Sequence, residues 1–303
     1  MSTLGIGITC RDGGRMTAIE MTAAAGTAAP KRPMSGAAAG LDAALGWAAT
    51  RALAEAIRGG TFERLAAGRA DPTELAAAVG LPVDRLLAQL AALGAQGLVQ
   101  LEEDGRVQLA DHAGEVARAA AVVLGGGVPA APPRLDWPIL DPALGTWAAA
   151  ALAPAGRWLV LGGDAGFVRS FGEGLDLSHQ AEDAAEFGAA LAGEDWPVGL
   201  DGVLILRGLG RSAKTAISAV IEAAEEALHP GGCFACLDLV LDDDYAGPRH
   251  AGLWAFAQAD LGGEAPPLTL NFLGLRLAEL CFTPPVAAEA PDGVHRLIWS
   301  RRD

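Results

Sequence analysis

A buried strand that runs into a glycine-rich turn is the feature that most restricts how this chain can fold. The strand candidate is RWLVL, Arg157 to Leu161, and the turn is GGDAG, Gly162 to Gly166. A second apolar strand follows over Asp201 to Leu206, then a helical pattern over Ala213 to Leu228 and a third strand over Cys233 to Val240. Strands joined by a crossover helix pair in parallel. The order therefore predicts a parallel α/β sheet in the second half of the chain.

Two further elements are expected at the end of this domain. A helical pattern over Leu270 to Leu280 predicts a last helix. Residues Val294 to Ser300 alternate in hydropathy, which is typical of a strand at a sheet edge.

The first half of the chain shows helical spacing. Apolar residues recur at helical intervals from Leu41 to Ile57, and the pattern ends at Gly59-Gly60. The segment Asp71-Pro72-Thr73-Glu74 combines an N-cap acid, a proline at the first helical position and a capping-box glutamate, which predicts a helix start. Further helices are expected over Thr61 to Ala67 and Val83 to Ala95.

A predicted hairpin follows these helices. Its strands are Gly97 to Leu101 and Arg106 to Leu109, and they flank a turn that ends in Asp104-Gly105. Helices followed by a hairpin are the order of elements in a winged helix. The sequence thus predicts an N-terminal winged-helix domain.

Composition divides the chain into four parts. Residues 1–40 are rich in Gly, Ala, Thr and Ser and lack periodicity, which predicts a disordered tail. The winged-helix domain is expected over residues 41–124. Residues 125–156 contain glycine and proline runs and are expected to form a linker with a short helix over Pro142 to Leu152. The α/β domain takes residues 157–303.

Charge and cysteine content restrict the partners and the compartment. The 303 residues include 22 basic and 37 acidic side chains, a net charge of −15, which disfavours nucleic acid and anionic membranes. No segment reaches the roughly 20 uninterrupted apolar residues that span a bilayer. The four cysteines, Cys10, Cys233, Cys236 and Cys281, are too few and too irregular for a disulfide framework. We therefore expect a soluble, cytoplasmic protein.

The order of these elements, with the stretch EEALHPGGCFACLDLVLDDD, resembles the S-adenosylmethionine-dependent small-molecule O-methyltransferases. The resemblance covers roughly Leu41 to Arg301. The segment ELAAAVGLPVDRLLAQLAALGAQGLVQLEEDGRVQLAD is similar to that family's winged-helix dimerisation domain, and DGVLILRGL and CFACLDLV look like its fourth and fifth strands. The resemblance implies a shortened, Rossmann-like class I methyltransferase domain, S-adenosylmethionine as cofactor, and a homodimer or heterodimer formed through the N-terminal helical domain.

The resemblance implies a cofactor site at the glycine turn. Gly162, Gly163 and Gly166 match the family's turn, where side chains would collide with the cofactor's amino-acid end. Asp164 replaces the middle glycine, and Val160 stands where the family has an acid inside the strand. The alternative to cofactor contact is a tight strand-to-helix connection that holds no ligand.

The candidate for the acid that binds the ribose hydroxyls at the end of the second strand is Asp176. Only nine residues separate Gly166 from Asp176, too few for a full helix and a full strand. Either the helix is reduced to a turn around Phe167 to Phe171 or the strand is vestigial. A solvated or capping role is the alternative for Asp176.

The family's proton acceptor has no counterpart at the expected place. In the family, a histidine in LHDW just after the fourth strand takes the proton of the substrate hydroxyl. Here Arg207 to Ser212 reads RGLGRS. His250, in a loop after DDDYAGPR, is the candidate replacement base, and His229 is expected to cap the C-terminal end of a helix.

Three other patterns are given structural interpretations. Cys233 and Cys236 lie three apart in a buried strand and point to opposite faces, so core positions are expected rather than a redox or metal pair. The adjacent carboxylates Asp242 to Asp244 cannot all face one ion, so a solvated loop and no metal are expected. The presumed recognition helix, VDRLLAQLAALGAQG, holds a single arginine, Arg85, which argues against DNA binding.

These departures lead to a hypothesis about function. The chain is expected to be an O-methyltransferase-family protein with eroded cofactor and catalytic motifs, acting on small molecules as a non-methylating binding, scaffold or partner subunit or with altered chemistry. S-adenosylmethionine is then a doubtful cofactor. The alternatives are an active S-adenosylmethionine-dependent O-methyltransferase on a small hydroxylated metabolite and a winged-helix regulator.

Overall fold

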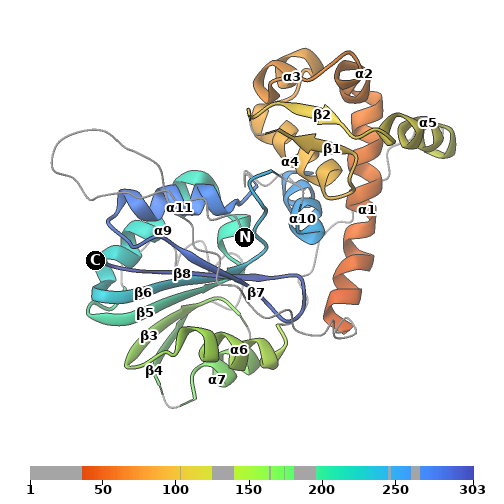
Figure 1. Ribbon diagram of the computed structural model, residues 1–303. Coiled ribbons are helices and arrows are strands. Elements are labelled where there is room, and N and C mark those ends of the chain that lie inside the picture. Colours follow the sequence, from red (N-terminus) through yellow and green to blue (C-terminus); the bar gives the residue numbers. More distant parts are fainter. Residues whose placement is uncertain are drawn as a thin grey trace, which may run out of the picture.

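The computed structural model contains a sheet flanked by helices, with a helical N-terminal domain beside it (Figure 1). It describes residues 36–102, 104–124, 140–163, 165–173, 175–180, 196–244, 247–260 and 267–303. Most of the predicted tail and residues 125–139 of the predicted linker lie outside these ranges. The helix predicted from Leu41 begins earlier, at Gly36, so the expected tail is shorter than 40 residues.

The sheet is mostly parallel, as the strand–helix–strand order predicted. Among the described residues its six strands lie in the order β4, β3, β5, β6, β8, β7. The four parallel strands are β4 (Asp176–Gln180), β3 (Arg157–Leu161), β5 (Leu200–Leu206) and β6 (Leu228–Asp238). The antiparallel strands are β8 (Arg296–Arg301) and β7 (Val286–Glu289).

Helices cover both faces of the sheet (Figure 1). On one face, α9 (Lys214–Ala227) and α11 (Leu270–Glu279) pack on side chains such as Leu159, Ile205 and Phe234. On the other face, α6 (Pro142–Leu152) and α7 (Ala165–Phe171) pack on Trp158, Val160 and others. The sheet therefore has a separate hydrophobic core on each face, as expected for parallel strands buried on both sides.

Two sequence predictions about this domain are wrong. The terminal strand β8 is not at the sheet edge, because the short strand β7 pairs on its outer side. The helix α6, predicted as part of a linker, belongs to the sheet domain, since Leu144, Ala148 and Leu152 are buried against β3 and α7. Its start follows the predicted chemistry: Asp141 caps the helix and Pro142 is its first residue.

The short stretch of chain between Gly166 and Asp176 was expected either to reduce the helix to a turn or to leave the strand vestigial. The structure shows neither outcome. Both the helix α7 and the strand β4 form. They fit because Asp176 begins β4 instead of ending it, so the nine residues after Gly166 hold only the rest of α7 and a turn.

The N-terminal domain follows the predicted element order. The helices are α1 (Gly36–Arg58), α2 (Thr61–Ala66), α3 (Pro72–Val79), α4 (Val83–Gly94) and α5 (Ala113–Leu124), and the hairpin strands are β1 (Val99–Leu101) and β2 (Val107–Leu109). The Asp71 side chain accepts hydrogen bonds from the backbone N–H groups of Thr73 and Glu74, as the start signal predicted. Gly105 turns the hairpin at a φ of 78°.

The helix α10 (Arg249–Asp260) joins the two domains, although the chain reaches it from the sheet. Trp254 and Phe256 of α10 are buried in a cluster with Leu45 and Ala52 of α1 and with residues of α4. A Cβ on Gly252 would lie less than 3.0 Å from the backbone oxygen of Ala91, so α10 and α4 approach closely there. One apolar cluster thus contains residues of both domains. Figure 1 shows α10 beside α1 and α4.

An ion cluster lies at the end of this junction. The Asp260 carboxylate, whose side chain is 5% exposed, forms ion pairs with Arg51 Nε and Arg85 Nη2, each at 2.7 Å. Glu55 contacts the same two arginines at 3.1 and 2.7 Å. The Arg85 guanidinium also lies 4.6 Å from the centroid of the Phe256 ring. The cluster ties α1, α4 and α10 together.

Among the described helices, none alone is long and apolar enough to span a membrane. The pair α3 and α4, bent by 106°, reaches that length and composition only when the two are taken together.

We expect Gly252→Ala to destabilise the protein by about 2 kcal/mol, because the new methyl group would force α10 away from α4. Gly274→Ala in the middle of α11 is the matched control. Its Cβ would meet only Pro285 Cγ at 3.6 Å, so the better helix propensity of alanine should leave stability unchanged or raise it by up to about 1 kcal/mol. Urea denaturation measures both, and equal effects would contradict the close packing.

We expect Asp260→Asn to lower the free energy of unfolding by about 3 kcal/mol, the low end for a broken buried pair, because Glu55 still neutralises part of the charge. The control is Asp84→Asn, which removes an exposed ion pair with Lys214 at 3.2 Å and should cost less than about 1 kcal/mol. Thermal and urea unfolding compare the two. A cost for Asp260→Asn no larger than that of the control would show that the cluster is not stabilising.

Candidate functional site

The carboxyl ends of the parallel strands lie at one edge of the sheet, the edge where ligands bind in open α/β folds. Gly162 follows β3, Arg207 follows β5, and Asp238 ends β6. The parallel registers of β3, β5 and β6 bring these ends side by side. This edge is therefore the candidate site.

The glycine turn has the backbone conformation that glycine favours. Gly162 and Gly163 have φ values of 77° and 82°. A Cβ on Gly163 would lie less than 3.0 Å from Cδ1 of Leu206, the last residue of β5, which is 3% exposed. Gly166 lies inside α7, where its backbone oxygen accepts from the Ser170 hydroxyl. Asp164 lies outside the described residues. The turn is thus packed against β5.

Asp176 lies at the amino end of its strand, whereas the glycine turn follows the carboxyl end of β3. The prediction that Asp176 ends the second strand is therefore wrong. Asp176 is the first residue of β4 and pairs in register with Arg157, the first residue of β3. Four residues of strand, about 13 Å, separate it from the turn. Its side chain is 77% exposed and contacts the Arg157 guanidinium at 3.7 Å. The residue that ends β4 is Gln180, and the next acid, Glu182, lies outside the described residues.

The segment after β5 contains a short 3₁₀ helix, η1 (Leu209–Arg211), in place of a catalytic histidine. Arg207 has a φ of 56°, an uncommon conformation for a residue with a side chain, and its backbone N–H donates to the Leu237 oxygen at 2.8 Å. The Ser212 hydroxyl donates to the Gly208 oxygen at 2.8 Å. Residues 207–212 hold neither a histidine nor a carboxylate.

Asp238 is a buried acid at the carboxyl ends of the strands, and no local pattern in the sequence marks it. Its side chain is 1% exposed and accepts from the backbone N–H groups of Gly210 at 3.0 Å and Leu239 at 2.8 Å. Burial raises the pKa of Asp238, while the two N–H groups and the nearby charges of His295 and Arg207 oppose that rise.

A histidine–aspartate pair lies beside Asp238 and was also missed. His295 Nδ1 is 2.6 Å from Asp292 Oδ2, and Asp292 Oδ1 accepts from the backbone N–H groups of Val294 and His295. Burial alone would raise the pKa of Asp292, but the hydrogen bonds and charge of His295 lower it overall. The signal in the sequence was PDGVH, an aspartate turn directly before the terminal strand.

The other histidines lie elsewhere. His250 is in the first turn of α10, the helix that packs on the N-terminal domain, and its role as a base stays a prediction. His229 does not cap a helix, contrary to the prediction. Its Nε2 lies 2.9 Å from Asp201 Oδ1, near the amino ends of the parallel strands. The Asp201 carboxylate also accepts a hydrogen bond from the Arg157 backbone N–H. The hydrogen bond to Asp201 raises the pKa of His229.

The structural interpretation of the cysteines is confirmed. Cys233 and Cys236 are buried in the cores on opposite faces of the sheet. Burial raises the pKa of Cys233 to about 11 and that of Cys236 well above its usual value. Neither thiol is therefore a reactive thiolate at neutral pH.

The acidic run after β6 separates into three directions. Asp242 contacts Arg296 Nη1 at 2.5 Å, Asp243 accepts from the Asn271 backbone N–H at 2.9 Å, and Asp244 lines a hollow under the β1–β2 hairpin. Within the described ranges, no group of three or more His, Cys, Asp or Glu side chains could hold a metal ion.

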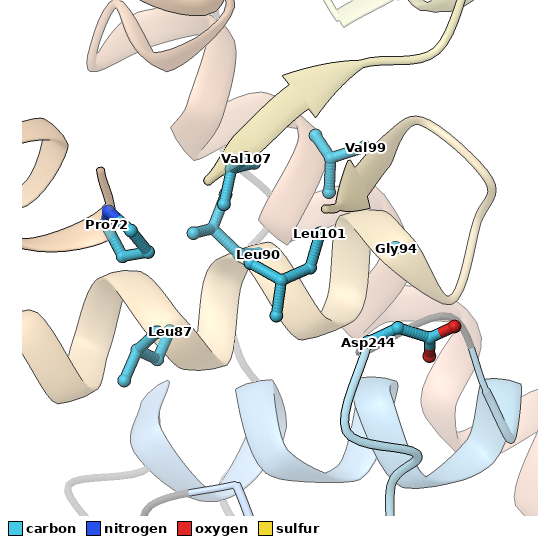
Figure 2. Close-up of a pocket in the computed structure, with 8 residues that line it drawn as sticks. All are labelled: Pro72, Leu87, Leu90, Gly94, Val99, Leu101, Val107 and Asp244. Atoms are coloured by element: carbon cyan, nitrogen blue, oxygen red, sulfur yellow. The ribbon is translucent and has the colours of Figure 1, made fainter. Parts of the chain in front are cut away.

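That hollow is apolar and small. Figure 2 shows Leu87 and Leu90 of α4 together with Val99, Leu101 and Val107 of the hairpin around it, with Asp244 at one side. Its cavity volume is about 10 Å³, the room of one water molecule. We interpret it as a packing gap.

We expect Gly163→Ala to destabilise the protein more than Gly199→Ala does. Both residues have positive φ, so both variants carry a backbone cost of roughly 1–2 kcal/mol. A Cβ at Gly199 meets nothing within 4 Å, whereas one at Gly163 would collide with Leu206, adding about 1–3 kcal/mol. Urea denaturation measures the difference. The double variant Gly163→Ala with Leu206→Ala separates the collision from other causes, since it should show a smaller combined cost than the sum of the single variants.

Comparisons with known proteins bear on the fold. Protein-family models and curated protein sequences gave no match to this chain. Among solved structures, an O-methyltransferase family 2 protein from Planctomyces limnophilus DSM 3776, in complex with apigenin, matches with a TM-score of 0.62 at 16% identity, covering 90% of this chain and 98% of that chain.

Two other matches are weaker. A putative O-methyltransferase from Nostoc punctiforme PCC 73102 has a TM-score of 0.43 at 13% identity, covering 89% of this chain and 100% of its own. Human N-acetylserotonin methyltransferase, in complex with S-adenosylmethionine, has a TM-score of 0.40 at 17% identity. The match covers 86% of this chain and 96% of that chain. On the first of these three comparisons, the chain has the fold of an O-methyltransferase.

Proposed function

We propose that this protein is a non-methylating member of the S-adenosylmethionine-dependent O-methyltransferase family, acting as a binding or partner subunit on small molecules. The observation that carries the proposal is the contact between Gly163 and Leu206. The glycine that leaves space for a cofactor in relatives here leaves space for a buried leucine of β5. Packing alone accounts for the retained glycine.

Two further features support the proposal. Attack on a sulfonium methyl group requires removal of the hydroxyl proton, and residues 207–212 offer no group that accepts a proton at neutral pH. Asp176, the acid expected to bind the ribose hydroxyls, lies at the amino end of β4, away from the glycine turn. The turn, the ribose acid and the proton acceptor thus all depart from what methyl transfer needs.

The N-terminal domain supports a partner role better than a DNA-binding one. Arg85, the single arginine of the presumed recognition helix, is engaged by Glu55 and Asp260, and α4 is covered by α10. A DNA-reading helix needs free basic side chains. We propose that the N-terminal helical domain forms a homodimer or a heterodimer, as the family resemblance implies.

An active methyltransferase is the second candidate, because Gly162 and Gly163 keep the left-handed conformation of a cofactor-binding turn. The O-methyltransferase family 2 protein that matches with a TM-score of 0.62 was solved in complex with apigenin. A flavone is therefore the methyl acceptor to test.

Titration calorimetry with S-adenosylmethionine and with S-adenosylhomocysteine distinguishes the two candidates. We expect no binding heat at ligand concentrations on the order of 1 mM. A dissociation constant near 1 µM, about −8 kcal/mol, would overturn the proposal. Transfer of a labelled methyl group from S-adenosylmethionine to apigenin, measured on the same preparation, would establish the second candidate. Circular dichroism of that preparation verifies that the protein is folded.

A further inference from the structure

Asp201 joins the amino ends of three parallel strands. It is the second residue of β5, and its Oδ2 accepts a hydrogen bond at 2.7 Å from the backbone N–H of Arg157, the first residue of β3. A Cβ on Gly156, whose φ is 74°, would lie less than 3.0 Å from the same oxygen, so the chain passes directly over the carboxylate. The other oxygen, Oδ1, lies 2.9 Å from Nε2 of His229, the second residue of β6.

Both ring nitrogens of His229 face oxygen atoms that only accept hydrogen bonds. Nε2 faces the Asp201 carboxylate, and Nδ1 lies 2.5 Å from the backbone oxygen of Pro230. A neutral imidazole has one N–H and one bare nitrogen, so it donates to one of these oxygens and sets a lone pair against the other. The imidazolium ion donates to both. The geometry therefore fits the charged form of the ring.

The Asp201 carboxylate is the charged group that contacts this ring. The hydrogen bond from the Arg157 backbone N–H, and after it the one from His229, lower the pKa of Asp201, so the carboxylate is ionised at neutral pH. Arg301 and Arg302 direct their guanidinium groups to backbone oxygens of the β6 start, at Gly231 and Leu228. The titratable and charged groups of the surrounding elements are Arg157 of β3, Asp176 of β4, Glu225 of α9, Cys233 of β6, and Arg301 and Arg302 at the end of the chain.

We propose that His229 is a pH-sensitive bridge: as an imidazolium it fastens the start of β6 to Asp201 at the start of β5, and loss of its proton breaks one of its two contacts. The His229 side chain is 42% exposed, so the ring exchanges its proton with solvent while the sheet stays folded. The bridge lies at the ends of the strands opposite the candidate site. It is therefore independent of whether the protein methylates.

The sign of the pH dependence follows from these contacts. The hydrogen bond to Asp201, and after it the one to the Pro230 oxygen, raise the pKa of His229 above its ordinary value of about 6.5. A group whose pKa is raised on folding contributes stability that is fully present below its unfolded-state pKa and is lost as the pH rises through its folded-state pKa. The bridge is thus closed in acid and opens as the pH rises through the raised pKa of His229.

Nuclear magnetic resonance of the histidine ring nitrogens in the full chain, recorded from about pH 5 to about pH 8, tests the bridge. The signals that disappear in His229→Gln assign the residue. We expect both nitrogens of His229 to carry protons at the acidic end, and the titration midpoint to lie above about 6.5. A midpoint at or below that value would overturn the proposal.

Two acids at the same end of the sheet provide a variant and its matched control. Asp201→Asn replaces the carboxylate with a neutral amide, so the titration midpoint of His229 should fall. Asp176→Asn removes an acid whose contact is with the Arg157 guanidinium, and it should move the midpoint less. Equal shifts in the two variants would contradict the bridge.

Stability gives a second readout, which remains if Asp201→Asn does not fold. The free energy of unfolding of the unchanged protein minus that of His229→Gln should decrease from about pH 5 to about pH 8, because glutamine has no proton to lose. Urea denaturation measures both proteins at each pH. A difference that is constant, or that grows as the pH rises, would show that the charged ring does not fasten the two strands.

Discussion

The close approach of α10 to α4 at Gly252 is the contact on which the arrangement of the two domains depends. With no side chain at Gly252, the backbone of α10 lies directly against the backbone of α4 at Ala91, and Trp254 and Phe256 are buried in the same apolar cluster. The ion cluster of Arg51, Glu55, Arg85 and Asp260 then closes the end of the junction. The helix therefore belongs to the sheet domain by connectivity and to the N-terminal domain by packing.

Local patterns in the sequence predicted the elements whose stability is local or whose burial is complete. β3, β5 and β6 each contain a buried apolar run, and α3 has both its N-cap aspartate and its first-turn proline. The hairpin turn at Gly105 was predictable because its positive φ favours glycine. In each case the residues that determine the element lie within it.

The missed features depend on contacts between distant residues. β7 is a four-residue strand with no fully buried side chain, so only its pairing with β8 defines it. The position of Asp176 was misjudged by one strand length, because nothing local tells the first residue of a short strand from its last. The burial of Asp238 and its neighbour His295 follows from the antiparallel pairing of β6 with β8, which brings together residues 57 positions apart in the chain. The role of α10 was invisible for the same reason: it is apolar on several sides, and its partners are about 200 residues away.

The two cysteines of β6 have a consequence that reaches beyond their lack of reactivity. Cys233 faces the core beneath α6 and α7, and Cys236 faces the core beneath α9 and α11. Each thiol can meet a reagent only when its own layer of helices separates from the sheet. Their relative rates of alkylation therefore form a natural pair of probes for the order in which the two layers open, with no label added to the protein.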